Sequence, residues 1–339
     1  MSPTAAARRA AVRKALDAVR AGCDLEARRG ADPVGFVHRY RNPLDRELVG
    51  LVAACIAFGN VRTIRAKLED LLVRVGPSPH RAAADARALR RRLDGWKHRV
   101  FLGEDVARLL AGARGLQREH GTLGAAFRAE LARADAASSD PSAALRSAIG
   151  GFSAAIRRAG GLARGGPRRG PAHLLPDAAG TSGNKRFLLF LRWMVRPKDG
   201  IDLGQWDVPA SRLLIPVDVH IHKLSRNLGL TGRPDLSWRT TVEITRALAA
   251  FDPEDPVKYD FSLCHMGMLQ RCPSRADAAR CEGCAVMPVC VHWTRRASRA
   301  VLRSSREASR APSREPSSPE AKGIRGRELA KIEDGCDKK

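Results

Sequence analysis

Apolar residues recur every three or four positions over most of the chain, which is the spacing of a helix with one buried face. Runs in which β-branched and polar residues alternate, the mark of a strand, are almost absent. The pattern therefore predicts an all-α fold. Apart from the two helices treated next and a last core helix after residue 255, the expected helices span residues 5–29, 45–56, 61–72, 81–94, 104–117, 122–134 and 241–250.

One short helix is delimited on both sides in the stretch LLIPVDVHIHKLSRNLGL, residues 213–230. Pro216 ends the preceding segment, and Asp218 has the short acceptor side chain of a helix N-cap. Apolar residues follow at helical spacing until Gly229, which stands where a C-cap glycine is expected. The first turn displays Asp218, His220 and His222.

A second helix begins inside AAGTSGNKRFLLFLRWMVRPKDG, residues 178–200. A turn of small residues leads into a helix that is apolar nearly all round, and such a helix is buried. Lys185 falls in its first turn, where both the helix dipole and burial favour the neutral amine, the nucleophilic form. The alternative is that Lys185 reaches solvent beside Arg186.

Two shorter segments carry polar side chains near predicted helix ends. Gly59 gives a tight turn between two helices, so Asn60 and Arg62 are expected to be exposed at a helix-helix corner. In GWKHRVF, residues 95–101, Trp96 and Phe101 are predicted to be core residues, with contact to nucleic acid as the alternative. The Gly/Arg-rich segment 157–170 is expected to be irregular.

The net charge of the chain indicates which kind of partner it binds. The 339 residues include 60 Lys and Arg against 36 Asp and Glu, a net charge of +24. Such a field concentrates polyanions, so nucleic acid is the expected partner, with a generically basic protein as the alternative. No secretory signal is visible, and no run approaches the roughly 18 apolar residues of a membrane span. We expect a cytoplasmic protein that does not enter a membrane.

Four cysteines lie close together in the pattern C-x8-C-x2-C-x5-C and form a complete thiolate set for a metal centre. A single CxxC flanked by lone cysteines favours one [4Fe-4S] cluster over zinc, which remains the alternative. The other cysteines in apolar settings, Cys23, Cys55 and Cys264, are expected to be buried small hydrophobes. The predicted ligands are Cys272, Cys281, Cys284 and Cys290.

In order along a basic helical chain, the turn with Lys185, the IPVDVHIHKL stretch with Asp218 and the four-cysteine loop resemble the helix-hairpin-helix DNA glycosylase superfamily, the relatives of endonuclease III and oxidised-guanine glycosylase. The stretches NKRFLLFLRWMVRPKDGIDLGQW and FDPEDPVKYDF are also similar to a bacterial family of uncharacterised function usually placed in that superfamily. This second resemblance spans about residues 30–292.

The resemblance implies roles for the two candidates. Asp218, in a V-D-x-H context, matches the catalytic carboxylate, and Lys185, in the G-x-K context that starts at Gly183, matches the lysine that attacks the sugar of an extruded nucleotide. The hairpin is represented by residues 179–184, and residues 196–212 form an insertion expected to line the base pocket, with a packed surface loop as the alternative. The substrate-binding residues expected are Asn60, Arg62, Gly183, Trp193, Arg196, Trp206 and His220, with Trp193 or Trp206 stacking on the base.

The same resemblance implies a domain plan of an N-terminal helical segment that packs on the C-terminal subdomain, a helical subdomain with the hairpin equivalent, a helical subdomain with the cysteine loop, and a disordered basic tail. The expected function is a DNA-repair glycosylase, with or without lyase activity, acting on double-stranded DNA as a nucleoid-associated monomer. The alternatives are a non-catalytic nucleic-acid-binding protein on the same scaffold and an RNA-directed relative. The expected bounds are 1–44, 45–213, 214–295 and 296–339.

Overall fold

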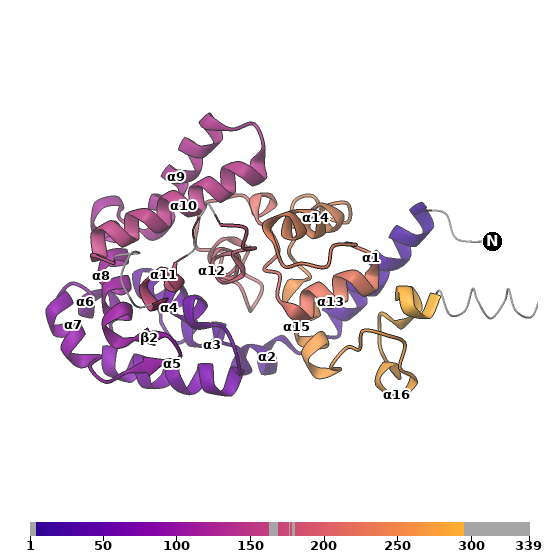
Figure 1. Ribbon diagram of the computed structural model, residues 1–339, viewed down its shortest axis with the longest axis horizontal. Helices are drawn as coiled ribbons and strands as arrows, with labels where there is room; N and C mark the ends of the chain where they lie inside the picture. The colour runs from indigo at the N-terminus through magenta and orange to yellow at the C-terminus, as the bar shows by residue number, and fades with distance from the viewer. Residues whose placement is uncertain (1–4, 163–168, 176, 178–179, 295–339) are drawn as a thin grey trace, which may run out of the picture. The chain divides into compact units, whose positions relative to one another are not determined.

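The computed structural model shows a helical protein whose described residues contain one short antiparallel hairpin, β1 (Lys97–His98) with β2 (Phe101–Leu102). The predicted all-α fold is confirmed (Figure 1). The predicted tail, the middle of the Gly/Arg-rich segment and Ala179 lie outside the described residues. The structure describes residues 5–162, 169–175, 177 and 180–294.

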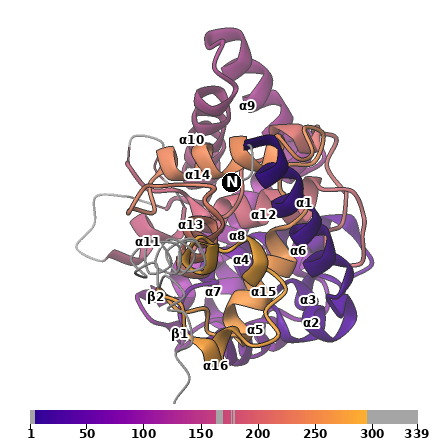
Figure 2. The same cartoon turned by 90° about the vertical axis from the view of Figure 1, so that its right-hand side faces the viewer.

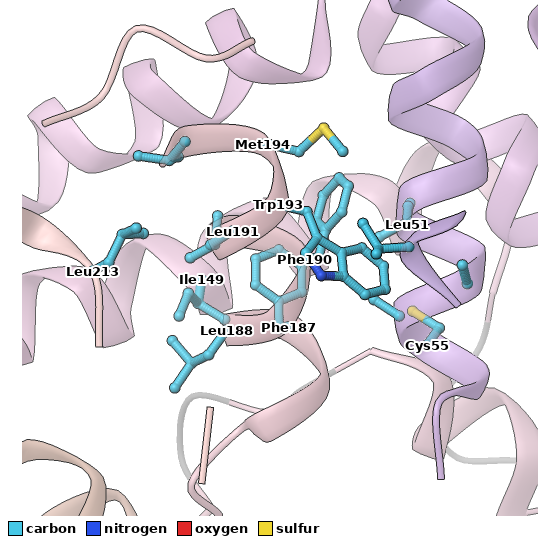
Figure 3. Close-up of a cluster of buried hydrophobic side chains, with 14 of the residues drawn as sticks. Leu51, Cys55, Ile149, Phe187, Leu188, Phe190, Leu191, Trp193, Met194 and Leu213 are labelled. Atoms are coloured by element: carbon cyan, nitrogen blue, oxygen red, sulfur yellow. The ribbon is translucent and has the colours of Figure 1, made fainter. Parts of the chain in front are cut away.

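The core is built around two helices that are apolar nearly all round, α4 (Pro43–Ile56) and α12 (Lys185–Val195). They approach closely at Gly50, where an added Cβ atom would lie 2.7 Å from the end of the Met194 side chain and 3.2 Å from the Phe190 ring. Figure 3 shows Trp193 and Leu51 in the cluster of buried side chains where the two helices meet. Burial of these apolar surfaces is the main stabilising contribution to such a core.

A group of longer helices packs beside this pair, with α10 (Pro141–Gly160) against both α8 (Gly103–His120) and α9 (Leu123–Ala137). The sequence pattern did not predict α10, and the segment expected to be irregular begins inside its last turn. The neighbouring helices are α5 (Val61–Val75), α6 (Pro79–Ala82), α7 (Ala86–Arg92) and α11 (Arg169–Leu174).

The C-terminal half contributes α13 (Val219–Leu228), α14 (Trp238–Ala249) and α15 (Asp260–Leu269), of which α13 packs on α15. The N-terminal helix α1 (Ala5–Ala21) also packs on α15 and on the 3-10 turn η2 (Met287–Val289) (Figure 2). The described residues up to 294 form one compact unit, so the boundary at residue 213 stays a prediction. The remaining elements are α2 (Leu25–Ala31), α3 (Val34–Val37), η1 (Ala210–Arg212) and α16 (Ala278–Cys281).

Two predicted helices are each broken into two by a capping aspartate. The helix expected over 5–29 stops at Ala21, and Asp24 caps α2 by accepting from the Ala27 amide. The helix expected over 81–94 is interrupted before α7, where Asp85 accepts from the first amides of that helix. In both places a local side-chain acceptor competes with continuation of the helix.

A buried carboxylate on α4 fixes the start of α9 and the segment that follows α12. Glu47 is 0% exposed and accepts from the amides of Leu123 and Gly124 and from the side chains of Gln117 and Trp206, at 2.8 to 3.0 Å. Burial raises the pKa of Glu47, and these four donors oppose the rise. One side chain thus joins three separate segments of the chain.

Replacement of Glu47 by alanine should lower the free energy of unfolding by about 3 kcal/mol or more, because several buried donors lose their acceptor. Urea-induced unfolding of the full chain measures this change. Glu69→Ala is the matched control, since Glu69 is exposed on α5 and its ion pair with Arg39 lies at the surface; that change should cost less than about 1 kcal/mol. Equal losses in the two variants would contradict this account.

No helix in the part of the chain that the structure describes is long and apolar enough to cross a membrane.

Candidate functional site

Asp218 is the N-cap of α13, as its place in the sequence predicts. Its Oδ1 atom accepts from the backbone amides of His220 and Ile221, both at 2.9 Å. Its Oδ2 atom lies 3.7 Å from the Sγ atom of Cys264 on α15. The half-buried carboxylate is therefore fixed at one oxygen by the helix start, while the other oxygen faces a second helix.

Lys185 is the first residue of α12, and its half-buried side chain reaches back to the end of α4, with Nζ 3.5 Å from the carbonyl oxygen of Ala57. The turn before it is held against the start of α14, since the Gly183 amide donates to the Leu236 carbonyl at 3.2 Å. A Cβ atom at Gly183 would stand 2.8 Å from that same oxygen. The glycine is thus required by close packing of two backbones.

Both candidates act electrostatically on residues at the start of α15. The charges of both Lys185 and Asp218 act on Asp260 and on Cys264, which follow one another by a single helical turn. Burial raises the pKa of Asp260 to about 6, and the Arg192 guanidinium opposes that rise. Two residues that the 196–212 segment separates along the chain therefore share an electrostatic environment.

A chain of buried ion pairs continues from Asp260 through α12 into the segment 196–212. Arg192 donates to Asp260 and, at 3.2 Å, to Asp202. Arg196 donates to Asp202 as well and lies 2.9 Å from a carboxylate oxygen of Asp255. The carboxylates around the two guanidinium groups raise the pKa of both arginines against the effect of burial.

These buried ion pairs contradict the expectation that the segment 196–212 lines a base pocket. Trp193 is 0% exposed in the core (Figure 3), Trp206 is 5% exposed and stacks on Phe127, and Arg196 is 3% exposed within its ion pairs. The structure places neither indole where a base can stack. The segment is packed instead, because its charged residues neutralise one another and its tryptophan donates to Glu47.

The helix-helix corner before α5 lies beside Lys185, as the contact of that lysine with Ala57 shows. Asn60 caps α5 by accepting from the Arg62 amide at 2.9 Å, and both side chains are exposed, as predicted. Trp96 and Phe101 are buried core residues, which confirms the core interpretation of their segment. The corner therefore presents polar and basic groups next to the lysine.

Phe58 of the same corner lies under two guanidinium groups, those of Arg99 at 5.2 Å and Arg186 at 5.3 Å from the ring centre. His220 stands on the face of α13 that meets α15, where a Cβ atom on Gly267 would come within 3.4 Å of it. An aromatic ring with two guanidinium groups thus stands at the corner whose Ala57 carbonyl contacts Lys185.

The four predicted metal ligands follow α15. Cys281 and Cys290 are buried, whereas Cys272 and Cys284 are half-buried. Burial and the charges of the other three thiols raise the pKa of Cys272, and the Asn227 amide, which donates to its sulfur at 3.2 Å, opposes the rise.

Among the described residues no three Cys, His, Asp or Glu side chains converge closely enough to hold a single metal ion. The described cysteines are all free thiols. The four sulfur atoms therefore lie within electrostatic range of one another without meeting at one point. Of the cysteines expected to be simple apolar residues, Cys55 is buried on α4, whereas Cys264 contacts Asp218.

Sequence reasoning missed Asp260 and Cys264. Asp260 lies in the FDPEDPVKYDF stretch, where nothing distinguishes it from the other carboxylates, and Cys264 sits in an apolar run that suggests only burial. Their position opposite Asp218 comes from the packing of α15 on α13. The sole signal available in the sequence is the helical spacing that puts the two residues on one face.

The chain matches the model of a family described as "Protein of unknown function (DUF2400)" over residues 32–269, and it belongs to that family. The matched region includes Lys185, Asp218, Asp260 and Cys264 and ends before Cys272. No curated protein and no solved structure gives a significant match.

The variant Asp260→Asn tests the raised pKa of this buried carboxyl. The folded value of about 6 lies above the ordinary value of 3.8, so the folded state binds the proton more tightly. The stability contributed by Asp260 is thus present at low pH and falls as the pH rises from about 4 to 6. The free energy of unfolding of the wild type minus that of the variant should decline across this window, by about 1.4 kcal/mol per unit of pKa difference.

Urea unfolding between about pH 4.5 and 7.5 measures the decline. The matched control is Asp199→Asn in the same network. Arg196 holds the pKa of Asp199 below its ordinary value against the effect of burial, so Asp199 takes up its proton below the pH range of this experiment. The free energy of unfolding of the wild type minus that of Asp199→Asn should therefore stay constant across the range. A difference that rises with pH for Asp260→Asn would refute the assignment.

Proposed function

We propose that this member of the DUF2400 family is a DNA glycosylase that removes an altered base, with Lys185 as the nucleophile and Asp218 as the electrostatic carboxylate. The observation that supports the proposal is that the charges of both side chains act on Asp260 and Cys264 near the start of α15, with Asp218 Oδ2 3.7 Å from Cys264 Sγ. An amine and a carboxylate at one half-buried site are the groups that cleavage of a glycosidic bond through a covalent intermediate needs.

The chemistry assigns one role to each group. The neutral amine of Lys185 attacks the sugar carbon C1′, and the bond from C1′ to the base nitrogen breaks as the base leaves with its electron pair and takes up a proton. The nitrogen of Lys185 then loses a proton, and the C1′–O4′ bond breaks as O4′ keeps the electron pair and takes up a proton. The sugar ring opens, and an iminium linkage joins C1′ to the lysine. Asp218 faces the positive charge that develops on the sugar, and its fixed position at the helix start means that it needs no reorganisation.

Charge and exposure support DNA as the partner. The chain carries a net charge of +24, and the exposed Asn60 and Arg62 lie at the corner whose Ala57 carbonyl contacts Lys185. Contacts of this kind position a phosphate backbone without reading its sequence. The base must leave the stack to reach a half-buried lysine, which is the usual requirement for chemistry on a nucleotide within a duplex.

For the cysteine loop we propose a [4Fe-4S] cluster bound by Cys272, Cys281, Cys284 and Cys290. The proposal is supported by the kind and number of donors, because a cubane cluster takes one thiolate at each of its four irons. The Asn227 amide supplies the kind of hydrogen bond to sulfur that tunes such clusters. When bound, the cluster would cross-link the loop after α15 and hold its basic residues in place.

Borohydride trapping tests the nucleophile. We expect wild-type protein, incubated with a panel of duplexes that carry oxidised, alkylated or deaminated bases, to give a covalent adduct with at least one of them. Lys185→Ala should abolish the adduct, and Asp218→Asn should slow its formation about a hundredfold or more. Lys198→Ala is the control, since this exposed lysine of the 196–212 segment has no proposed role.

An undiminished adduct in Lys185→Ala would contradict the proposal. Salt-sensitive binding without trapping or cleavage across the panel would favour a non-catalytic nucleic-acid-binding protein. Preference for structured RNA over duplex DNA would favour an RNA-directed relative.

Iron and sulfide analysis of protein purified without oxygen tests the cluster. About four iron and four sulfide per chain, with a brown colour, are expected for the wild type and for Cys55→Ser. Cys281→Ser should lose both. A colourless protein that contains zinc would refute the iron-sulfur assignment and support the alternative.

A further inference from the structure

The proposed chemistry leaves unused a side chain that contacts the second oxygen of Asp218. Cys264 Sγ lies 3.7 Å from Asp218 Oδ2. Burial, together with the nearby charges of Asp218 and Asp260, raises the pKa of the Cys264 thiol well above its ordinary value. The thiol therefore keeps its proton at neutral pH and acts as a donor to the carboxylate.

The two carboxylate oxygens of Asp218 have different hydrogen-bond partners and therefore different roles. The amides of His220 and Ile221 both donate to Oδ1, so the helix start occupies that atom. Oδ2 remains for the sugar. The Cys264 thiol adds a donor on Oδ2 to the two amides on Oδ1, so both oxygens of the carboxylate are held. A thiol is a weak donor, so it orients Oδ2 and leaves it able to accept charge from a ligand.

The helix packing makes this contact possible. A Cβ atom on Gly267, three residues after Cys264, would lie 2.9 Å from Leu224 Cδ1 and 3.4 Å from His220 Cβ. The glycine thus permits the close approach of α15 to α13. A side chain as short as cysteine then spans the gap to Asp218.

We infer that Cys264 is a positioning residue whose thiol donates to Asp218 Oδ2 and directs that oxygen at the cationic sugar of the extruded nucleotide. This inference rests on the proposed function. It assigns to the cysteine no bond to the substrate and no covalent step.

The test uses two probe duplexes that differ only in charge at the reacting position. One carries a pyrrolidine abasic-site mimic, whose ring ammonium stands in for the cationic sugar, and the other carries the neutral tetrahydrofuran mimic. The readout is the ratio of the two affinities, which an oriented carboxylate raises and which general folding or phosphate contact does not change.

We expect wild-type protein to prefer the pyrrolidine duplex, and Asp218→Asn to lose the preference. Cys264→Ala should reduce the ratio about fivefold, the size of one weak hydrogen bond to a charged group. Cys264→Ser should restore it, because the hydroxyl also donates. Cys55→Ala, which removes another buried thiol, is the matched control and should keep the wild-type ratio.

The tetrahydrofuran duplex also reports whether each variant is folded, since its affinity should not change in Cys264→Ala. If Cys264→Ala keeps the wild-type ratio of the two affinities while Asp218→Asn loses the preference, this inference is overturned and the proposed function is not. A wild-type protein that neither prefers the pyrrolidine duplex nor forms a borohydride adduct would overturn the proposed function as well.

Discussion

The buried ion pair between Arg192 and Asp260 is the interaction on which the candidate site depends. Arg192 belongs to α12, the helix that starts with Lys185, and Asp260 is the first residue of α15, the helix that faces Asp218. The pair therefore sets the distance between the helix that carries the amine and the helix that orients the carboxylate. Loss of Arg192 would leave the Asp260 carboxylate without this buried counter-charge, which strongly destabilises a fold.

The segment 196–212 extends the network of buried ion pairs around Arg192. Asp202 is 0% exposed and bridges Arg192 and Arg196, so the chain after α12 is folded back onto the helix that it follows. Trp206, further along the same segment, donates to the buried Glu47 carboxylate. The segment 196–212 thus packs against α12 and α4 and does not line a pocket.

Local signals in the sequence predicted local structure well. A proline, a short acceptor and a glycine delimit α13, and Asp218 caps it as predicted. Caps such as Asp24 and Asp85 were present in the sequence too, but the apolar spacing runs through them and hid the breaks. The helix α10 was missed although Asp140 and Pro141 mark its start in the way such residues do elsewhere.

The sequence could not predict which residues meet across helices. Trp193 and Trp206 were expected at a pocket because aromatic side chains suit both a base and a core, and only packing decides between the two. Cys264 was expected to be inert because its neighbours are apolar, yet α13 brings a carboxylate to it. The match to the DUF2400 family covers these helices and ends before the cysteine loop, so the helical site and the proposed cluster rest on separate observations.

The most direct measurement for the central claim is peptide mapping of the borohydride-reduced protein-DNA adduct by mass spectrometry. The account predicts that the sugar remnant is found on the peptide that contains Lys185. A remnant on the N-terminal amine or on any other lysine would contradict it.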